Sequence, residues 1–319
     1  RPEREFSQNA RVRFRKIKFR KIKFCGGKRA ELFVWEKFMI REEIDLYDYF
    51  HRPRGKAVSG TLAAFRHGQM NEMPVRTVRP AMLVLPGGGY GFVSQREAEP
   101  VAMEYYAQGF DVFVLDYDVA PVGYPVQLEE AAMAIMYIRR NADAFDILPD
   151  KVAAIGFSAG GHLLGCIGTI WNDPAVKEIF GRESEKVRPD ASVYSYAVVS
   201  PDLAIYRGNT FKNFCGGNAS PHDYAIDANV GKDCRPAFIW GNSPDRTVLP
   251  EHAVRLYLAY LAAGVPAELH LFREGWHGMT VCSAETEGEL PMNPACEYVR
   301  PWVGLSVNFL KTLGFVSEK

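Results

Sequence analysis

Residues 151–161, K-V-A-A-I-G-F-S-A-G-G, are the stretch that decides the fold of this 319-residue chain. The apolar run at 152–155 is too short for a free-standing helix and is bounded by turn-forming residues, so it predicts a buried strand. Ser158 follows within a G-x-S-x-G motif, and the small residues after it can begin a helix. A strand, a sharp turn centred on a serine and then a helix form a nucleophile elbow, in which the flanking glycines let strand and helix pass closely. The stretch therefore predicts a catalytic serine at position 158.

Strands and helices alternate on both sides of this motif, which predicts an α/β fold with a mostly parallel sheet and helices on both of its faces. Ahead of the alternating part, residues 32–35 and 44–50 predict an antiparallel hairpin, and residues 61–65 predict a further strand. Residues 174–189 are polar and predict irregular structure. Further strands are predicted at 79–85, 111–116, 191–199, 237–241 and 267–272, and helices at 100–108, 126–140, 252–263 and 302–313.

The chain divides by composition into a basic start and one larger domain. Residues 1–30 are rich in Lys and Arg and contain the tandem repeat F-R-K-I-K at 14–18 and 19–23. Such charge density repels itself and buries little, which favours a flexible extension over a polyanion-binding arm. No linker divides residues 31–319, so we expect a single domain. Within it, residues 202–235 are rich in Gly, Asn, Asp and Pro and predict a small cap-like insertion over the carboxyl edge of the sheet.

The composition also narrows the partners and the compartment. Beyond the basic start, acidic residues outnumber basic ones, so no nucleic-acid partner is expected for the catalytic part. No apolar run approaches the length of a membrane span and no secretory signal is recognisable, so we expect a cytoplasmic protein without a membrane partner. The sequence leaves the oligomeric state open.

The six cysteines show no spacing typical of a metal site. Reduced thiols in a reducing compartment are therefore expected, and disulfides Cys215–Cys234 or Cys282–Cys296 remain the alternative.

A serine hydroxyl needs a base to take its proton, and the base needs an orienting carboxylate. In a sheet of this kind the partners follow in the order serine, acid, histidine, on loops at the carboxyl ends of later strands. Asp245 lies four residues beyond the strand ending at 241, and His277 follows the last strand. We therefore predict Ser158 as the nucleophile, His277 as general base and acid, and Asp245 as the orienting anion.

Other residues fit these roles less well. Asp202, after the preceding strand, is the alternative acid, whereas Glu274 is expected to be solvated. His162 is only four residues past Ser158 and is expected to pack within a helix. The remaining histidines show no grouping that would hold a metal, and no metal or cofactor is expected.

An oxyanion hole is the next requirement, because the tetrahedral intermediate carries negative charge on the former carbonyl oxygen. Residues 87–89 are three glycines after a buried strand, so their backbone N–H groups can approach that oxygen without a side chain in the way. We predict Gly88, Gly89 and Ala159 as donors. The alternative is a plain turn, whereas a phosphate-binding loop is disfavoured because neither glycine motif of such loops is present.

Six motifs together resemble the α/β-hydrolase superfamily, within the group of hormone-sensitive-lipase-like esterases and intracellular acetyl xylan esterase-like proteins. The resemblance covers about residues 79–315 and implies an α/β-hydrolase fold and a serine esterase. The motifs are P-G-G-G-Y (86–90), S-Q-R-E-A-E-P-V-A (94–102), D-Y-D-V-A-P (116–121), G-F-S-A-G-G-H-L (156–163), S-P-D-R-T-V (243–248) and L-F-R-E-G-W-H-G (271–278).

Two positions depart from the pattern of these relatives. Pro86 replaces the histidine of H-G-G-G, which affects the support of the oxyanion loop, and Asp118 replaces the arginine of Y-R-L-A-P. Both departures, and the lack of an obvious apolar lid, disfavour a true lipase. By analogy with the family, Ser94, Arg96 and Glu99 shape the acyl pocket or brace the oxyanion loop; the alternative is an ordinary helix start.

The expected activity is hydrolysis of a carboxylic ester through an acyl-serine, with removal of short acyl groups, acetyl above all, from a hydroxylated small molecule such as an acetylated sugar or xylo-oligosaccharide. An oligopeptidase-like peptidase and an arylformamidase or thioesterase use the same triad and remain alternatives. An inactive hydrolase-fold binding protein is the alternative from another class.

Overall fold

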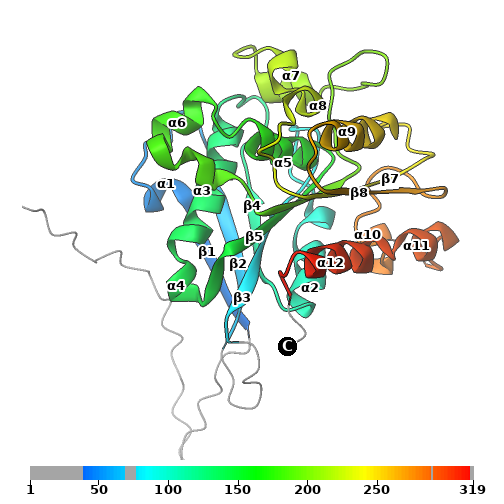
Figure 1. Ribbon diagram of the computed structural model, residues 1–319, viewed down its shortest axis with the longest axis horizontal. Helices are drawn as coiled ribbons and strands as arrows, with labels where there is room; N and C mark the ends of the chain where they lie inside the picture. The colour runs from blue at the N-terminus through cyan, green and yellow to red at the C-terminus, as the bar shows by residue number, and fades with distance from the viewer. Residues whose placement is uncertain (1–38, 69–76, 289, 317–319) are drawn as a thin grey trace, which may run out of the picture. The chain divides into compact units, whose positions relative to one another are not determined.

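One sheet of eight strands organises the computed structural model of the chain, which describes residues 39–68, 77–288 and 290–316 (Figure 1). The spatial order of the strands is β1-β2-β4-β3-β5-β6-β7-β8. The strands are β1 Met39–Asp45, β2 Thr61–His67, β3 Arg79–Leu85, β4 Asp111–Asp116, β5 Ile147–Phe157, β6 Ala191–Ser195, β7 Ala237–Asn242 and β8 Ala267–Phe272.

Strand β2 runs opposite to the other strands of this sheet. β1 pairs antiparallel with β2, and β2 pairs antiparallel with β4, whereas every pair from β4 across to β8 is parallel. The predicted mostly parallel sheet with an antiparallel N-terminal hairpin is confirmed. The carboxyl ends of β3, β5, β6, β7 and β8 consequently meet at one edge, where the loops that follow them can assemble a site.

Helices cover both faces of the sheet, as predicted (Figure 1). Alternate residues along each strand enter different cores: Ala81 and Leu83 of β3 belong to one apolar cluster, Met82 and Val84 to the other. The first core is closed by α3 (Val126–Arg140), α5 (Ala159–Thr169) and α9 (Glu251–Ala262), and the second by α2 (Glu99–Ala107) and α12 (Trp302–Thr312).

The remaining helical elements are short. They are α1 Leu46–Tyr49, η1 Gln95–Glu97, α4 Ala142–Phe145, α6 Pro174–Phe180, η2 Gly181–Val187, α7 Thr210–Cys215, η3 Pro221–Tyr224, α8 Ile226–Asn229, α10 Ala284–Glu287 and α11 Pro294–Val299.

Three predicted segments differ from the structure. The strand at 44–50 is wrong, because Asp45 ends β1 and its side chain accepts the N–H groups of Tyr47 and Asp48, which starts α1. The irregular segment at 174–189 is wrong too, because Asp173 caps α6 and a proline follows at its first position. The strand at 191–199 ends early, at Ser195, because Tyr196 turns out of it with φ 36°. The predicted strand at 32–35 and the basic extension at 1–30 lie outside the described residues.

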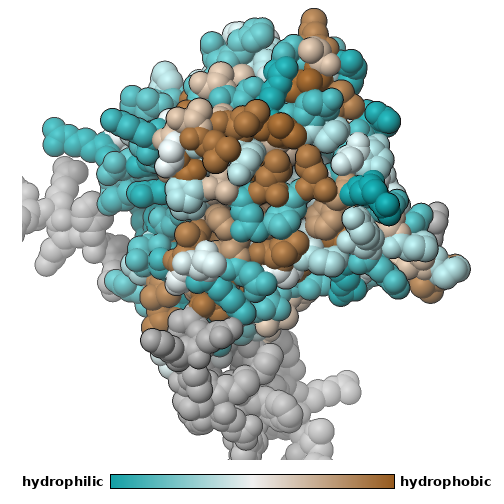
Figure 2. Space-filling view, turned by 45° about the vertical axis from the view of Figure 1, so that its right-hand side comes forward, coloured by the Kyte–Doolittle hydropathy of each residue, from teal (hydrophilic) through white to brown (hydrophobic). Residues whose placement is uncertain are grey.

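Helix α9 and the edge strand β8 contribute to the face seen in Figure 2, where apolar side chains gather among polar ones. The helix buries Ala253, Leu256 and Tyr260 against the sheet, whereas Leu258 and Leu261 are exposed. The helix therefore carries apolar side chains on its solvent-exposed side as well as on the side that packs against the sheet.

Among the helices of the described residues, none is long and apolar enough to cross a membrane. The five described cysteines are buried and free, so neither Cys215–Cys234 nor Cys282–Cys296 forms a disulfide.

Candidate active site

Ser158 lies at the tip of a strained turn between β5 and α5. Its backbone has φ 51° and ψ −114°, outside the region that a residue with a side chain prefers. The peptide is held in place because Ser158 N–H donates to Ser195 O at 3.0 Å and its carbonyl accepts from His162 N and Val198 N, each at 3.1 Å. The backbone that presents the hydroxyl is thus fixed by β6 and by the first turn of α5.

The flanking glycines permit this close passage of backbones. A Cβ on Gly156 would lie 2.4 Å from the carbonyl oxygen of Gly160, and a Cβ on Gly160 would lie 2.1 Å from that of Leu85. Neither contact is possible for a real side chain, so the motif needs glycine at both positions.

The structure brings the three predicted triad residues into one hydrogen-bonded row. His277 Nε2 lies 3.0 Å from Ser158 Oγ, and His277 Nδ1 lies 2.7 Å from Asp245 Oδ2. The other carboxylate oxygen of Asp245 accepts the N–H groups of Thr247 and Val248 at 2.8 and 3.0 Å. Because an ionised carboxylate only accepts, Nδ1 carries the proton and Nε2 presents its lone pair to the hydroxyl. This is the arrangement that a general base requires.

The glycine loop after β3 lies directly against the nucleophile. A Cβ on Gly87 would come within 3.0 Å of Ser158 Cβ, and Gly88 has φ +125°, a conformation that side chains rarely adopt. Within the described residues, the N–H groups of Gly88 and Gly89 have no protein acceptor. Ala159 opens α5, and the first N–H groups of a helix have no partner inside it. The three predicted oxyanion donors are therefore available, and their role stays a prediction.

Of the three residues named by analogy with the family, Ser94 contacts this loop and Arg96 contacts the segment after His277. Ser94 N–H donates to Gly87 O at 3.0 Å. Arg96 donates to the carbonyl oxygens of Gly278 and Thr286, on the segment that follows His277. Glu99 is exposed at the start of α2, as an ordinary helix residue would be.

The residue that the sequence reading missed is Glu97. Its side chain is only 4% exposed and accepts Gly87 N–H at 2.7 Å and the Tyr196 hydroxyl at 2.7 Å. Burial raises the pKa of Glu97, and the hydrogen bonds from Tyr196 and Gly87 oppose that rise. A buried carboxyl group is costly, so its place beside the glycine loop points to a role there.

The alternatives weighed for the triad are engaged elsewhere. Asp202 forms an ion pair with Arg255 at 2.8 Å, and Glu274 forms one with Arg273 at 2.9 Å. His162 is fully buried in α5, where its ring nitrogens lie 2.9 Å from the Tyr90 hydroxyl and 3.0 Å from the Tyr224 carbonyl. Burial lowers its pKa to about 4, so it is a neutral packing residue at ordinary pH. In the part of the chain that the structure describes, no group of three or more His, Cys, Asp or Glu could hold a metal ion.

Asp118, which departs from the family pattern, does not contact the triad. Its carboxylate accepts the N–H groups of Val58 and Ser59, at 3.0 to 3.1 Å. It thereby fastens the turn before β2 to the loop that follows β4, which is a structural role.

The insertion at 202–235 reaches the glycine loop through Asn213, whose side-chain amide donates to Gly89 O at 2.8 Å. It contains α7, η3 and α8.

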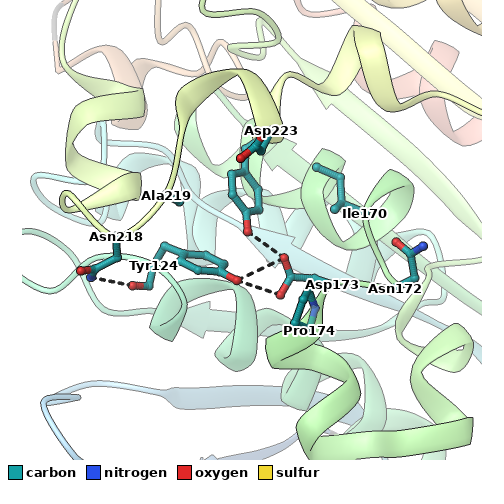
Figure 3. Close-up of a pocket in the computed structure, with 9 residues that line it drawn as sticks. Tyr124, Ile170, Asn172, Asp173, Pro174, Asn218, Ala219 and Asp223 are labelled. Carbon is teal, nitrogen blue, oxygen red and sulfur yellow. Dashed lines mark hydrogen bonds between the residues drawn. The ribbon is translucent and has the colours of Figure 1, made fainter.

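A depression of about 380 Å³ is lined in part by Tyr124, Asp173 and, from this insertion, Tyr224 (Figure 3). The Asp173 carboxylate accepts both tyrosine hydroxyls, at 3.0 and 2.7 Å, and also Ala175 N–H at 2.8 Å. Its hydrogen-bonding capacity is thus used to fasten the insertion to α6 and to the segment before α3. The depression marks a structural joint.

Known proteins resemble this chain in both sequence and fold. The profile of the BD-FAE family matches residues 71–259, more than half of the chain. Endo-1,4-beta-xylanase B of Butyrivibrio fibrisolvens is 30% identical over 219 residues, which cover 65% of this chain and 33% of that protein. Acetylxylan esterase of Xylanibacter ruminicola is 28% identical over 206 residues, which cover 62% of this chain and 40% of that protein. The chain thus spans less than half the length of these relatives.

Solved structures match over most of their length. MGS-M1, an α/β-hydrolase enzyme from a deep-sea metagenome library of the Medee basin, is 30% identical with a TM-score of 0.68, covering 86% of this chain and 98% of that one. An acetyl ester-xyloside bifunctional hydrolase from Caldicellulosiruptor lactoaceticus is 27% identical with a TM-score of 0.68, covering 83% of this chain and 98% of that one. The fold is therefore the predicted α/β-hydrolase fold. Within that superfamily, the chain belongs to the BD-FAE family.

Proposed function

We propose that the protein is a serine carboxylic-ester hydrolase that removes short acyl groups, acetyl above all, from a hydroxylated substrate such as an acetylated sugar or xylo-oligosaccharide. The observation that carries the proposal is the row Asp245–His277–Ser158, with contacts of 2.7 and 3.0 Å, beside a glycine loop with free N–H groups. The relatives support it, because one is named an acetylxylan esterase and another an acetyl ester-xyloside hydrolase.

Acylation begins when His277 Nε2 takes the proton of Ser158 Oγ as the oxygen attacks the ester carbonyl. The negative charge that develops on the carbonyl oxygen is received by the N–H groups of Gly88, Gly89 and Ala159. A preorganised donor of this kind contributes about 2.7 to 4 kcal/mol to lowering the barrier. Asp245 stabilises the imidazolium that forms between the two proton transfers.

Acylation ends when His277 gives its proton to the leaving alcohol, which departs and leaves an acyl-serine. Deacylation then repeats the same chemistry with water. His277 takes a proton from water, whose oxygen attacks the acyl carbonyl, and returns that proton to Ser158 Oγ as the acid leaves. Proton and charge balance over the two steps without a further reactant.

The substrate is proposed from the relatives and from the fold. A small insertion in place of a large apolar lid favours short acyl groups, and the substrate partner is a small-molecule ester. The five free, buried cysteines of the described residues support a reducing compartment such as the cytoplasm.

An acyl-chain series with product identification tests the proposal. We expect para-nitrophenyl acetate to be hydrolysed with a higher kcat/KM than the octanoate, and acetylated xylo-oligosaccharides to release acetate. A peptide amide should not be cleaved. Faster turnover of octanoate, or cleavage of the amide alone, contradicts the proposed substrate class.

A further inference from the structure

The short helix η1 lies between the glycine loop and α2. Two neighbouring side chains of this element contact two different loops of the proposed active site. Glu97 binds Gly87 on the loop after β3, whereas Arg96 binds Gly278 on the loop after β8. One short segment is therefore connected to both the oxyanion side and the histidine side.

The contact of Glu97 with Gly87 leaves no free space. A Cβ on Gly87 would lie 2.7 Å from Glu97 Oε2, 2.8 Å from Phe157 O and 3.0 Å from Ser158 Cβ. The peptide of Gly87 is thus enclosed between the carboxylate and the nucleophile elbow. Because Gly87 N–H is bound to Glu97, the next two N–H groups of the loop are left for an oxyanion.

The second oxygen of Glu97 extends the connection to the other loops. Tyr196 donates its hydroxyl to Glu97 Oε1 at 2.7 Å and accepts Thr280 N–H at 3.2 Å. Its ring also packs edge-on against His277, with 5.0 Å between the ring centroids. Tyr196 has φ 36°, so its backbone is held in a strained conformation at this point.

Pro86, which replaces the histidine of the family pattern H-G-G-G, explains why the glycine loop needs support from Glu97. Proline has neither a backbone N–H nor a polar side chain with which to support the loop. Glu97 supplies an acceptor at the following residue, and Tyr117 donates to Pro86 O at 2.5 Å.

We propose that Glu97 is a positioning residue, which fixes the peptide of Gly87 through one oxygen and the Tyr196–Thr280 contact through the other, and so aligns the oxyanion donors with His277. The inference rests on the proposed function. It assigns Glu97 no proton transfer and no contact with substrate. Misplacing donors by a fraction of an ångström weakens binding of the transition state and leaves binding of the ester itself nearly unchanged.

The chain offers a matched control. Glu130 is also buried and also accepts one backbone N–H, from Asp118 at 2.7 Å, and one tyrosine hydroxyl, from Tyr47 at 3.0 Å. None of these three residues contacts the triad. Removing either carboxylate disturbs a similar buried network, so a purely structural role predicts the same outcome for both.

The experiment compares Glu97→Gln and Tyr196→Phe with Glu130→Gln and Tyr47→Phe. It measures kcat and KM on para-nitrophenyl acetate, and the inhibition constant of a trifluoromethyl ketone, whose adduct with the serine carries an oxyanion. We expect Glu97→Gln to lower kcat by about tenfold to a hundredfold with KM near the wild-type value, and to weaken the inhibitor by a similar factor. Tyr196→Phe should show a smaller change in the same direction.

In both control variants kcat and inhibitor affinity should stay at the wild-type values, even where the unfolding temperature falls. The inference is overturned if Tyr196→Phe and a folded Glu97→Gln both keep the wild-type kcat and inhibitor affinity. It is also overturned if Glu130→Gln and Tyr47→Phe lose as much kcat as Glu97→Gln and Tyr196→Phe do. If Glu97→Gln does not fold, Tyr196→Phe, which loses one hydroxyl, decides alone. A wild-type protein without any hydrolytic activity would overturn the proposed function and this inference with it.

Discussion

Two buried clusters in this molecule have a similar hydrogen-bonding pattern and different neighbours. The Glu97 cluster (Gly87, Glu97, Tyr196, Thr280) and the Glu130 cluster (Gly60, Tyr47, Asp118, Glu130) each contain a carboxyl group that accepts one backbone N–H and one tyrosine hydroxyl. Burial raises the pKa of the carboxyl group in both. Each also has a glycine pressed against the carboxylate, where a Cβ would lie 2.7 Å from Glu97 Oε2 or 2.9 Å from Glu130 Oε1.

The difference lies in what the clusters join. The Glu130 cluster joins α1, the turn before β2 and α3, which are elements of the scaffold. The Glu97 cluster joins the loops after β3, β6 and β8, which adjoin the proposed nucleophile Ser158 and include the proposed base His277. A buried carboxylate–tyrosine pair is therefore not by itself evidence of a functional site. The residues that the pair contacts decide whether it affects catalysis or only stability.

The largest effect is expected when the proposed nucleophile, which lies beside the Glu97 cluster, is removed. Ser158→Ala should lower kcat on para-nitrophenyl acetate by at least about 10⁴-fold, because no other hydroxyl can form the acyl intermediate. Ser184→Ala is the matched change, since Ser184 is also buried and donates only to Gly181 O at 2.9 Å. Ser184→Ala should keep the wild-type kcat. Activity retained by Ser158→Ala would show that Ser158 is not the nucleophile.

The next largest effect is expected from a comparison of Asp245 with Asp118. Each is about 1% exposed, and each accepts two backbone N–H groups. Asp245→Asn should lower kcat by about 10⁴-fold, because the amide no longer fixes the imidazole tautomer. Asp118→Asn, in the Glu130 cluster, should instead cost about 1–3 kcal/mol of unfolding free energy and leave kcat unchanged. Steady-state kinetics and urea unfolding of both variants separate these outcomes, and equal kinetic effects contradict the comparison.

A third test uses the two glycines that face the carboxylates. Gly87→Ala should lower kcat by about a hundredfold, since the new methyl group displaces a loop that adjoins Ser158. Gly60→Ala meets Tyr47 and Glu130 and forces a side chain to φ +80°, so it should lower stability without a matching loss of kcat per folded molecule. Activity normalised to the folded fraction is the measurement. Similar losses in both variants would show that the carboxylate contact is only structural.

The last effect concerns acid stability on the active-site side and involves no change in kcat. His162 links the Tyr90 hydroxyl of the glycine loop to the Tyr224 carbonyl of the insertion, and its folded-state pKa is lowered from 6.5 to about 4. The unfolded chain therefore binds more protons between these values, so stability is lost as pH falls through this window and rises as pH returns. His162 alone should contribute roughly 3 kcal/mol to that loss.

Urea unfolding at several pH values checks this prediction. His162→Gln should be less stable near neutral pH and should lose less of its stability between pH 6.5 and 4 than the wild type does. A variant that reproduces the wild-type pH slope shows that another group carries the acid response.

The sequence was sufficient for the parts of the fold that depend on local patterning. Apolar runs between turn residues marked β3, β4, β5, β7 and β8 to within a few residues at either end, and the glycines around Ser158 marked the elbow. The positions of Asp245 and His277 followed from chain order and from the rule that loops at the carboxyl ends of parallel strands share one edge.

Other features depended on contacts that are distant in the chain. Asp45 and Asp173 start helices through side-chain caps, and neither helix has an apolar pattern long enough to predict it. Glu97 and Glu99 are two acids two residues apart, and only the start of α2 decides that the first is buried and the second exposed. Tyr196 has a positive φ of 36° although it is not glycine, and the residues next to it in the sequence do not predict this strained conformation.

Fluorophosphonate labelling followed by intact-protein mass and peptide mapping tests the central claim most directly, because the probe reacts only with an activated serine. We expect one adduct per chain, located on Ser158, with simultaneous loss of hydrolysis and no adduct in Ser158→Ala. A folded protein that stays unlabelled, or an adduct on a different residue, contradicts the assignment of Ser158 as the nucleophile.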